Sequence, residues 1–264
     1  MQLNCRFFNG YKPCSRNKEC SINCPEQDEI QNSILIIHLG ALGAVVRSTS
    51  LLFAIHRKYP KSMITWLTQT PADDLLRDHP LIDRVLTSSS EDQLTLKALR
   101  FDACFVIDKS PKAVGLAHSV QTEKYFGFTT HSKTGAIIPA TPAAEELWSL
   151  GLSNQKKFFE NNKSETQLLI EALDLGPFKR DPYYLPLTPG EKNLATARTH
   201  LWRKQKNQII IGLNTGCSAT IPYKKLTVEY HQQLIRLLLK NDYHNLVLLG
   251  GKEDKERNQS IALD

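Results

Sequence analysis

The stretch ILIIHLGALGAVVRSTSLL, residues 34–52, constrains the fold more than any other part of the chain. It opens with apolar residues typical of a buried strand, passes through Gly40 and Gly43, and continues in a pattern typical of a helix. A strand, a glycine loop and a helix are the first half of a βαβ unit. The stretch therefore predicts an α/β protein in which ligands bind where strands end.

The same alternation continues through the first half of the chain. We expect strands at 34–39, 63–67, 84–86 and 103–107, helices at 45–58, 72–78, 91–99 and 111–119, and two more helices in PAAEELWSLG and SETQLLIEALDLG. The last of these helices opens with a capping-box pattern at Ser164 and Gln167. This order indicates a mostly parallel sheet with helices on both faces, in whose core Cys104 would be a small apolar residue.

The stretch GPFKRDPYYLPLTPGE interrupts the periodicity with prolines and marks a domain boundary. A helix is expected at 191–204, followed by a second βαβ unit with strands at 209–213 and 245–249 around a helix at 228–239. Two strands with their helices cannot cover their own faces, so this second domain is expected to be incomplete. The alternative is that its strands extend the first sheet.

We therefore expect four segments. They are a cysteine-rich arm at 1–32, an N-terminal α/β domain at 33–180, a linker with a connecting helix at 181–206, and a partial C-terminal α/β domain at 207–264.

Composition narrows the class of protein. With 41% hydrophobic and 23% charged residues, no long apolar run and no secretory signal, the chain is expected to be globular and cytoplasmic. The net charge of +6 is spread over short basic clusters, which suits phosphate-bearing ligands or the surface of an anionic membrane; a solvated surface is the alternative. Without zinc-finger spacing or an aromatic RNA-binding signature, nucleic acid is not an expected partner.

Of the chain's 6 cysteines, Cys5, Cys14, Cys20 and Cys24 lie in the arm. Four thiolates can hold a tetrahedral zinc ion or an iron–sulfur cluster, and in a reducing compartment this is the favoured interpretation. The spacing matches neither a zinc knuckle nor a ferredoxin motif, so free redox-active thiols and disulfides stay open as alternatives.

Two loops follow predicted strands and carry groups suited to anions. The first, HLGALGAVV, lacks the dinucleotide-binding glycine spacing, which disfavours a nicotinamide enzyme. The second, NTGCSATIPYKK, offers hydroxyls, backbone amides and lysines that suit a diphosphate. It is not a Walker loop, and a surface loop with solvated lysines is the alternative.

The segments ILIIHLGALGAVVRSTSLLFAIHRKYPKSMITWLT, IIIGLNTGCSATIPYKKLT and NLVLLGGKEDKERNQSI resemble, in order, the motifs of glycosyltransferase family 9, the heptosyltransferases of lipopolysaccharide core assembly. The resemblance covers about residues 33–264. It implies two Rossmann-like domains facing across a cleft (the GT-B type), the second cut short at its C-terminus. It also implies inverting transfer without a metal ion, from a nucleotide sugar such as ADP-heptose to a lipopolysaccharide core or related glycolipid. For a cytoplasmic chain, peripheral contact with the inner face of the inner membrane is a further expectation.

The resemblance also assigns roles to residues. Gly40 and Gly43 would shape the turn beneath the acceptor. The donor would be bound by Thr215, Gly216, Lys224, Gly250, Gly251 and Glu253, and the hydroxyl of Ser218 in the second loop is a further candidate donor ligand. Among them Lys224 would stabilise the charge that grows on the departing diphosphate. The cysteine arm lies outside the common family core.

One departure concerns catalysis, because Ala44 stands where the family pattern has an aspartate, the expected general base for the acceptor hydroxyl. Loss of such a base slows the chemistry about 10²- to 10⁴-fold. Asp108 and His38 follow strands at the same edge of the predicted sheet and are candidate replacements. Arg47 would contact either an anionic acceptor group or a neighbouring carboxylate.

Three functions follow as hypotheses. The first is a glycosyltransferase. The second is a catalytically impaired relative that binds sugar nucleotides or glycans. The third is a metal- or redox-sensing protein that acts through its cysteine arm.

Overall fold

The structure is a computed structural model of the 264-residue chain. It describes residues 3–203, 205, 207–217, 222–242 and 244–262. The chain divides into two compact units, Met1–Pro186 and Leu187–Asp264. The division falls within the proline-rich stretch, so the connecting helix belongs to the second unit.

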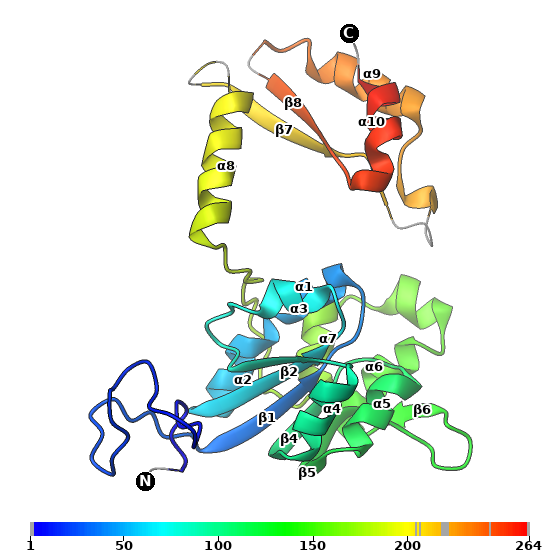
Figure 1. Cartoon of the computed structure of the whole chain (residues 1–264). Coiled ribbons are helices and arrows are strands. Elements are labelled where there is room, and N and C mark those ends of the chain that lie inside the picture. Colours follow the sequence, from blue (N-terminus) through cyan, green and yellow to red (C-terminus); the bar gives the residue numbers. More distant parts are fainter. Residues whose placement is uncertain (1–2, 204, 206, 218–221, 243, 263–264) are drawn as a thin grey trace. The chain divides into compact units, whose positions relative to one another are not determined.

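In its described residues the first unit contains a six-stranded sheet in the order β3-β2-β1-β4-β5-β6 (Figure 1). The strands are β1 (Asn32–Ile37), β2 (Ser62–Thr68), β3 (Arg84–Thr87), β4 (Arg100–Val106), β5 (Gln121–Thr130) and β6 (Ile137–Pro139). Neighbouring strands from β3 to β5 pair in parallel, and β6 pairs antiparallel with β5. The strand order reverses between β1 and β4, which is the kind of switch point where α/β proteins bind ligands.

Helices cover both faces of this sheet (Figure 1). They are α1 (Leu42–Ser48), α2 (Leu51–Lys58), α3 (Ala72–Leu76), α4 (Ser90–Lys97), α5 (Pro111–His118), α6 (Glu145–Leu150) and α7 (Glu165–Ala172), with short turns η1 (Pro142–Ala144) and η2 (Lys156–Glu160). Side-chain hydroxyls cap three of them, including Ser164, which accepts from the Gln167 backbone amide at 3.2 Å. This is one half of the predicted capping box, because the Gln167 side chain donates to Glu171 at 3.0 Å.

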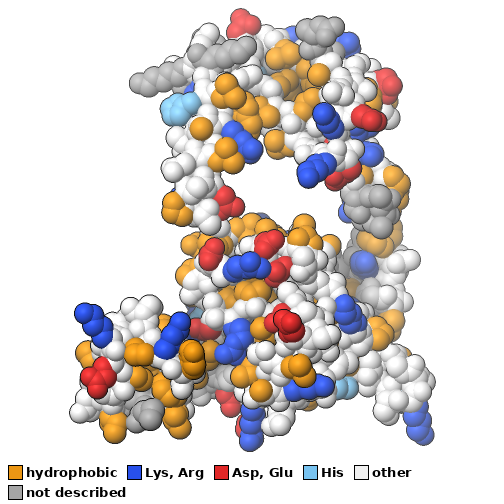
Figure 2. Space-filling view, viewed as in Figure 1, with side chains coloured by type: hydrophobic (Ala, Val, Ile, Leu, Met, Phe, Trp, Pro, Cys, Tyr) orange, Lys and Arg blue, Asp and Glu red, His pale blue; other side chains and the backbone are white. Residues whose placement is uncertain are grey.

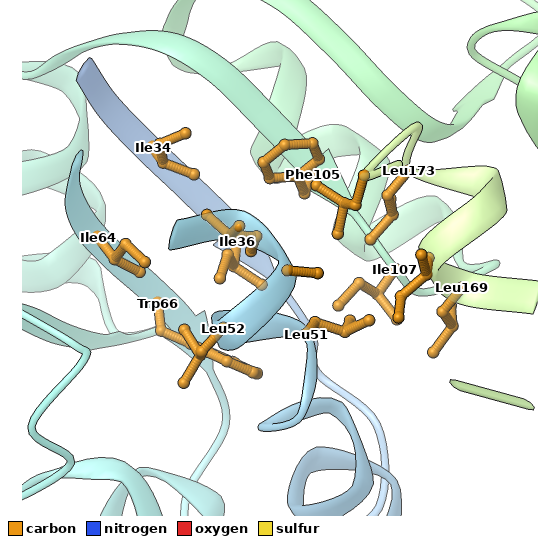
Figure 3. Packing of buried hydrophobic residues seen from close by; sticks show 14 of the residues in the cluster. Ile34, Ile36, Leu51, Leu52, Ile64, Trp66, Phe105, Ile107, Leu169 and Leu173 are labelled. Carbon is orange, nitrogen blue, oxygen red and sulfur yellow. The ribbon is translucent and has the colours of Figure 1, made fainter. Parts of the chain in front are cut away.

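Alternate residues of β1 face different layers, as expected for a strand buried on both sides. Ile34 and Ile36 pack with side chains of α1, α2, α3 and α7, and Figure 3 shows part of this cluster around Trp66 and Phe105. Leu35 and Ile37 pack on the other face with α4 and α5. Cys104 lies fully buried in this second cluster, which confirms its predicted place in the core.

The prediction of a single helix at 45–58 was wrong in two respects. Helix α1 begins at Leu42, and it ends at Ser48 before α2 begins. The hydroxyls of Ser48, Thr49 and Ser50 each donate to a carbonyl three residues earlier, at 2.7–2.9 Å. Such local bonds compete with the regular helical pattern, which explains the break. The prediction also missed β5 and β6.

The second unit contains helix α8 (Pro189–Trp202), strands β7 (Ile209–Asn214) and β8 (His244–Leu249), turns η3 (Pro222–Lys224) and η4 (Lys252–Asp254), and helices α9 (Val228–Leu238) and α10 (Lys255–Ile261). In the described residues β7 and β8 form a parallel two-stranded sheet of their own and do not extend the first sheet. The α/β class is thus confirmed, and the alternative of one continuous sheet is wrong. No helix in the described ranges combines the length and apolarity that crossing a membrane requires.

Candidate functional site

The carboxyl ends of β1 and β4 bring His38 and Asp108 together at the switch point of the first sheet. His38 Nε2 lies 3.8 Å from Asp108 Oδ1, and both side chains are largely buried, at 6% and 14% exposure. The Leu39 backbone amide donates to Asp108 Oδ2. The structure therefore holds both candidate replacement bases at the start of the glycine loop.

Gly40 is needed for this close approach. A Cβ atom at Gly40 would lie 3.0 Å from His38 Nε2 and 3.2 Å from Asp108 Oδ1, closer than side-chain carbons normally pack. Gly43 has a different place from the one expected, because it lies in the first turn of α1, where its carbonyl accepts from Arg47 Nη1 at 3.0 Å. Gly40 shapes the turn, whereas Gly43 is helical.

A second contact fixes the His38 ring. His38 Nδ1 and Ser48 Oγ are 2.7 Å apart, and the Ser48 hydroxyl also lies 3.1 Å from the Ala44 carbonyl oxygen. Both His38 and Ser48 are buried. His38 thus contacts both the Asp108 carboxylate and helix α1 from the end of β1.

Burial sets the titration of this pair. It raises the pKa of Asp108 above its ordinary value, even though the nearby imidazole and the Leu39 amide act in the opposite direction. Burial also lowers the pKa of His38, more than the attraction of Asp108 raises it. A carboxylate of raised pKa accepts a proton more readily and an imidazole of lowered pKa less readily, so Asp108 is the better candidate base of the two.

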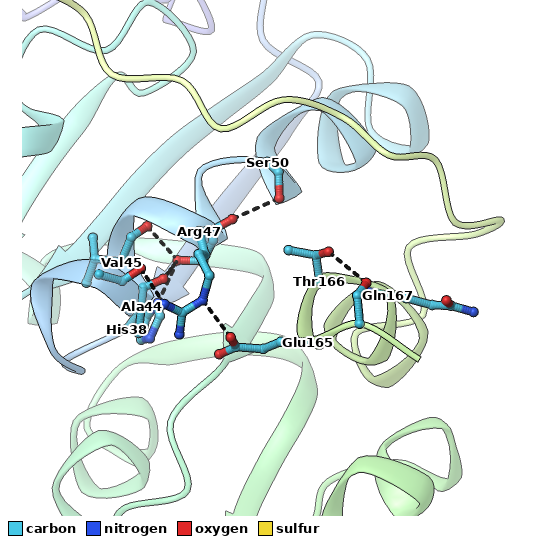
Figure 4. Close-up of polar contacts among 11 residues, drawn as sticks. His38, Ala44, Val45, Arg47, Ser50, Glu165, Thr166 and Gln167 are labelled. Carbon is cyan, nitrogen blue, oxygen red and sulfur yellow. Dashed lines mark hydrogen bonds and ion pairs between the residues drawn. The ribbon is translucent and has the colours of Figure 1, made fainter. Parts of the chain in front are cut away.

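Ala44 is half-buried in the first turns of α1 and offers a methyl group and its backbone to the site. Arg47 lies one turn further on, and its Nε donates to Glu165 Oε2 at 2.6 Å (Figure 4). Both side chains of this ion pair are about half exposed. The sequence predicted that Arg47 contacts either an anionic acceptor group or a neighbouring carboxylate, and the structure shows the contact with the Glu165 carboxylate.

A cavity of about 540 Å³ opens beside the glycine loop. Its lining comes from the loop and from the segment that follows β2: Leu39, Gly40, Ala41, Leu42, Gly43, Gln69, Thr70, Pro71 and Ala72. The volume is within the range of small-ligand sites, which is about 300–1,000 Å³.

In the second unit, the loops after β7 and β8 line a cavity of about 730 Å³ with Asn214, Gly216, Cys217, Lys225, Gly250, Gly251, Glu253 and Asp254. Four predicted donor residues, Gly216, Gly250, Gly251 and Glu253, are thus brought together. Ser218 lies outside the described residues, and the exposed Lys224 is in turn η3, whereas its neighbour Lys225 lines the cavity.

Thr215 has a supporting position. It is fully buried, and its hydroxyl bonds the Leu249 carbonyl at 3.1 Å and the Asn258 side chain. It therefore joins the end of β7 to β8 and α10 and does not line the cavity.

Three residues of this site were missed at the sequence level. Asp254 accepts from the Gly251 amide at 3.0 Å, and its carboxylate occupies the space that a Cβ at Gly216 would need. Arg257 donates to the Thr215 carbonyl at 3.0 Å and to the Leu226 carbonyl, and Asn258 contacts Thr215. For Asp254 the sequence does carry one local signal, an acidic residue in the first helical turn after a strand and a glycine loop.

The predicted metal ligands of the arm, Cys5, Cys14, Cys20 and Cys24, all line one small cavity in the first unit. Within the described residues, no three His, Cys, Asp or Glu side chains are arranged as a metal-binding group.

No family model matches the chain. Over 244 residues it is 22% identical to lipopolysaccharide heptosyltransferase 1 of Campylobacter coli, in a match that covers 84% of this chain and 65% of that protein. The chain thus spans slightly less than two thirds of this relative.

The solved structures to which this chain is similar include enzymes of the same kind as this relative. A glycosyl transferase of family 9 from Veillonella parvula is 16% identical with a TM-score of 0.64, covering 87% of this chain and 66% of that one. The E. coli ADP-heptose heptosyltransferase II is 18% identical with a TM-score of 0.60, covering 87% and 67%. E. coli heptosyltransferase WaaC, solved with an ADP-2-deoxy-2-fluoro heptose, is 17% identical with a TM-score of 0.52, covering 87% and 73%. This chain is therefore similar in sequence to a lipopolysaccharide heptosyltransferase and shares the fold of these glycosyltransferase family 9 structures.

Proposed function

We propose that this chain supplies the acceptor domain and part of the donor domain of a glycosyltransferase that moves a sugar, heptose by analogy, from an ADP-sugar to a lipopolysaccharide core or related glycolipid. The observation that carries the proposal is the agreement of sequence and fold comparisons with heptosyltransferases over more than four fifths of the chain. The two loop cavities, one in each unit, support it.

For the donor, we propose the cavity between the loops after β7 and β8. Lys225 on its wall together with the neighbouring Lys224 provides positive charge for a diphosphate. ADP-bound and ADP-sugar-bound structures exist for E. coli WaaC, which favours an adenine nucleotide here.

For the chemistry, we propose that Asp108 replaces the base missing at Ala44. The acceptor hydroxyl oxygen would form a bond to the anomeric carbon as the bond to the diphosphate oxygen breaks, and the hydroxyl proton would pass to the Asp108 carboxylate. The nucleoside diphosphate leaves with the bonding electrons, and the lysine charge stabilises it. His38 would act as a positioning residue, since it contacts Asp108 and is anchored by Ser48.

Donor binding can be measured by following the unfolding midpoint of the 264-residue chain with ADP or UDP. A ligand present at 100 times its Kd stabilises by about 2.7 kcal/mol. At about 1 mM nucleotide we expect ADP to raise the midpoint by several degrees and UDP to raise it less, with Lys225→Ala reducing the ADP effect. No shift with either nucleotide would contradict the donor assignment.

The second candidate function is a relative that binds glycans or nucleotide sugars without transferring them, and Ala44 is the observation that favours it. Introducing Ala44→Asp separates the two. A gain of roughly 10²-fold or more in transfer rate would show a competent transferase that lacks only its base, whereas little change in a measurable rate is expected if Asp108 already acts as the base. Binding without measurable transfer in both proteins would favour the binding function.

We also propose that the first unit touches an anionic membrane through turn η2. Phe158 and Phe159 are 66% and 77% exposed, and Lys157 Nζ lies 5.1 Å from the Phe158 ring centroid. Exposed aromatic and basic side chains side by side suit a lipid interface. Co-sedimentation with phosphatidylglycerol vesicles should decrease in Phe158→Ser/Phe159→Ser and not in Leu152→Ser, which removes a similarly exposed apolar side chain. Equal sedimentation of both variants and the natural chain would contradict the assignment.

A further inference from the structure

The N-terminal arm, residues 3–31, is long for a segment with so little regular structure. It has no helix and no strand, and one isolated bridge pairs Cys5 with Glu29. Its apolar side chains are poorly covered, with Leu3, Tyr11 and Ile22 exposed at 73%, 89% and 64%. In Figure 2 hydrophobic side chains show beside Lys and Arg on the surface of this arm. A segment of this size cannot bury enough apolar surface to order itself without a cross-link or an ion.

The two ends of the arm are nonetheless held together and attached to the sheet. The Arg6 amide donates to the Asp28 carbonyl at 2.8 Å, and Ile30 donates to Asn4 at the same distance. The Arg6 guanidinium contacts the Asp28 carboxylate at 3.0 Å, Asp83 and the Ser62 carbonyl. These contacts place Cys5 and the chain just after Cys24 at the same point.

The middle of the arm folds back toward this point. The Arg16 guanidinium lies 4.0 Å from the centroid of the Phe7 ring, and Asn17 Nδ2 donates to Cys24 Sγ at 3.4 Å. The loop that carries Cys14 and Cys20 is thereby returned to the ends of the arm.

All four cysteines of the arm line one small, partly open cavity of about 20 Å³, together with Phe7, Phe8, Lys12, Glu19 and Glu26 among others. All four are free thiols. A space of about 10–15 Å³ is enough for one water-sized occupant. The cavity therefore has room for a single ion.

We propose that Cys5, Cys14, Cys20 and Cys24 bind one zinc ion, and that this ion orders the arm. In the described residues the thiols surround a common cavity without yet being arranged as a metal-binding group, so binding would draw them inward. Each thiol loses its proton to solvent as its sulfur bonds to zinc, which completes a tetrahedral set of four sulfurs. This inference is independent of the proposed transferase activity.

Metal content of the purified 264-residue chain tests the proposal. We expect about one zinc ion per chain. A mercurial reagent that reacts with the four arm thiols should release this zinc as the thiols are consumed. Replacement of zinc by cobalt(II) should give the intense visible and charge-transfer bands of a tetrahedral tetrathiolate site. Cys5→Ser and Cys24→Ser should lose zinc, and Cys217→Ser, outside the arm, should keep it.

A second measurement does not depend on how the variants fold. Trypsin should cleave the wild-type chain after Arg16 or Lys18 much faster once a chelator has removed the zinc, while the α/β body stays intact because it has its own core. Three results would overturn the proposal: no bound metal with four titratable arm thiols, disulfides detected by mass, or iron with acid-labile sulfide. Unchanged cleavage after complete zinc removal would overturn the ordering role.

Discussion

His38 Nε2 lies 3.8 Å from Asp108 Oδ1, although a long stretch of sequence and the crossover between two strands separate the two side chains. The contact exists because β1 and β4 are neighbours at the point where strand order reverses. It places a largely buried carboxylate beside the loop that leads into helix α1, where Ala44 offers no base.

Asp108→Asn should lower the rate of sugar transfer by about 10²- to 10⁴-fold, because an amide cannot take the acceptor proton. ADP binding should be unchanged, since the donor is assigned to the other unit. Glu123→Gln, which alters an exposed carboxylate of β5, is the control and should transfer at the natural rate. An Asp108→Asn variant as fast as the natural chain would exclude Asp108 as the base.

The acid side of the pH–rate profile offers a separate test of this base. Burial raises the pKa of Asp108, so the carboxylate should become protonated, and transfer should decline, at a pH above the ordinary value of 3.8 for an aspartic acid. The expected signature is an acid limb that is lost in Asp108→Asn. If the limb persists in the variant, another group carries the titration.

Asp254→Ala should weaken ADP binding by about tenfold or more, because the carboxylate holds the Gly251 amide and fills the space beside Gly216. Glu256→Gln changes an exposed carboxylate on the adjoining helix α10 and serves as the matched control. Isothermal titration with ADP measures both. Equal affinities for the two variants would show that this loop contact has no part in donor binding.

The chain should lose stability as pH falls from about 6.5 to 4, in part through His79. This side chain is 2% exposed, its Nδ1 accepts from the Leu81 amide, and burial lowers its pKa to about 4. His79 binds a proton more readily in the unfolded chain than in the folded one. The free energy of unfolding is therefore highest above about pH 6.5 and falls by up to about 3 kcal/mol on acidification to about pH 4. Urea unfolding at about pH 7.5 and about pH 4.5 should show a smaller pH difference for His79→Gln than for the exposed control His118→Gln. Identical pH differences in both variants would rule out this contribution.

Gly127→Ala should destabilise the first unit by several kcal/mol. Gly127 has φ of +84°, and an added Cβ would overlap the Val106 carbonyl oxygen on the adjacent strand. Gly115→Ala, in helix α5 with no atom within 4 Å of the new methyl group, should instead stabilise by about 0.5–1 kcal/mol. Thermal unfolding measures the midpoint of both variants. A change of the same sign and size in the two midpoints would contradict this interpretation of the β4–β5 contact.

The buried strands were the easiest part of the fold to predict, because β1, β2 and β4 are nearly continuous apolar runs and β-propensity and burial agree in them. Strand β5 was missed because charged residues such as Glu123 and Lys124 are exposed on it and Gly127 interrupts its pattern. The break between α1 and α2 depends on hydroxyl bonds that hydrophobic periodicity does not report.

The candidate site was also predictable only in part. Asp108 could be found because it directly follows a strand, and strand ends in a parallel sheet lie at one edge. Its approach to His38, and the contacts that Asp254 and Arg257 make with the loop after β7, join segments far apart in sequence. Such pairings follow from register and loop conformation, which no local pattern contains.

The attachment of the arm through Arg6 has a practical consequence for protein engineering. Asp83 contacts Arg6 with one carboxylate oxygen and accepts from the Ile64 amide with the other, at 2.7 Å. A truncation that starts at β1 to obtain a shorter α/β fragment would leave this carboxylate without its cation beside the junction of β2 and β3. Designers who shorten the chain should therefore neutralise position 83 with Asp83→Asn, which keeps an oxygen for the Ile64 amide.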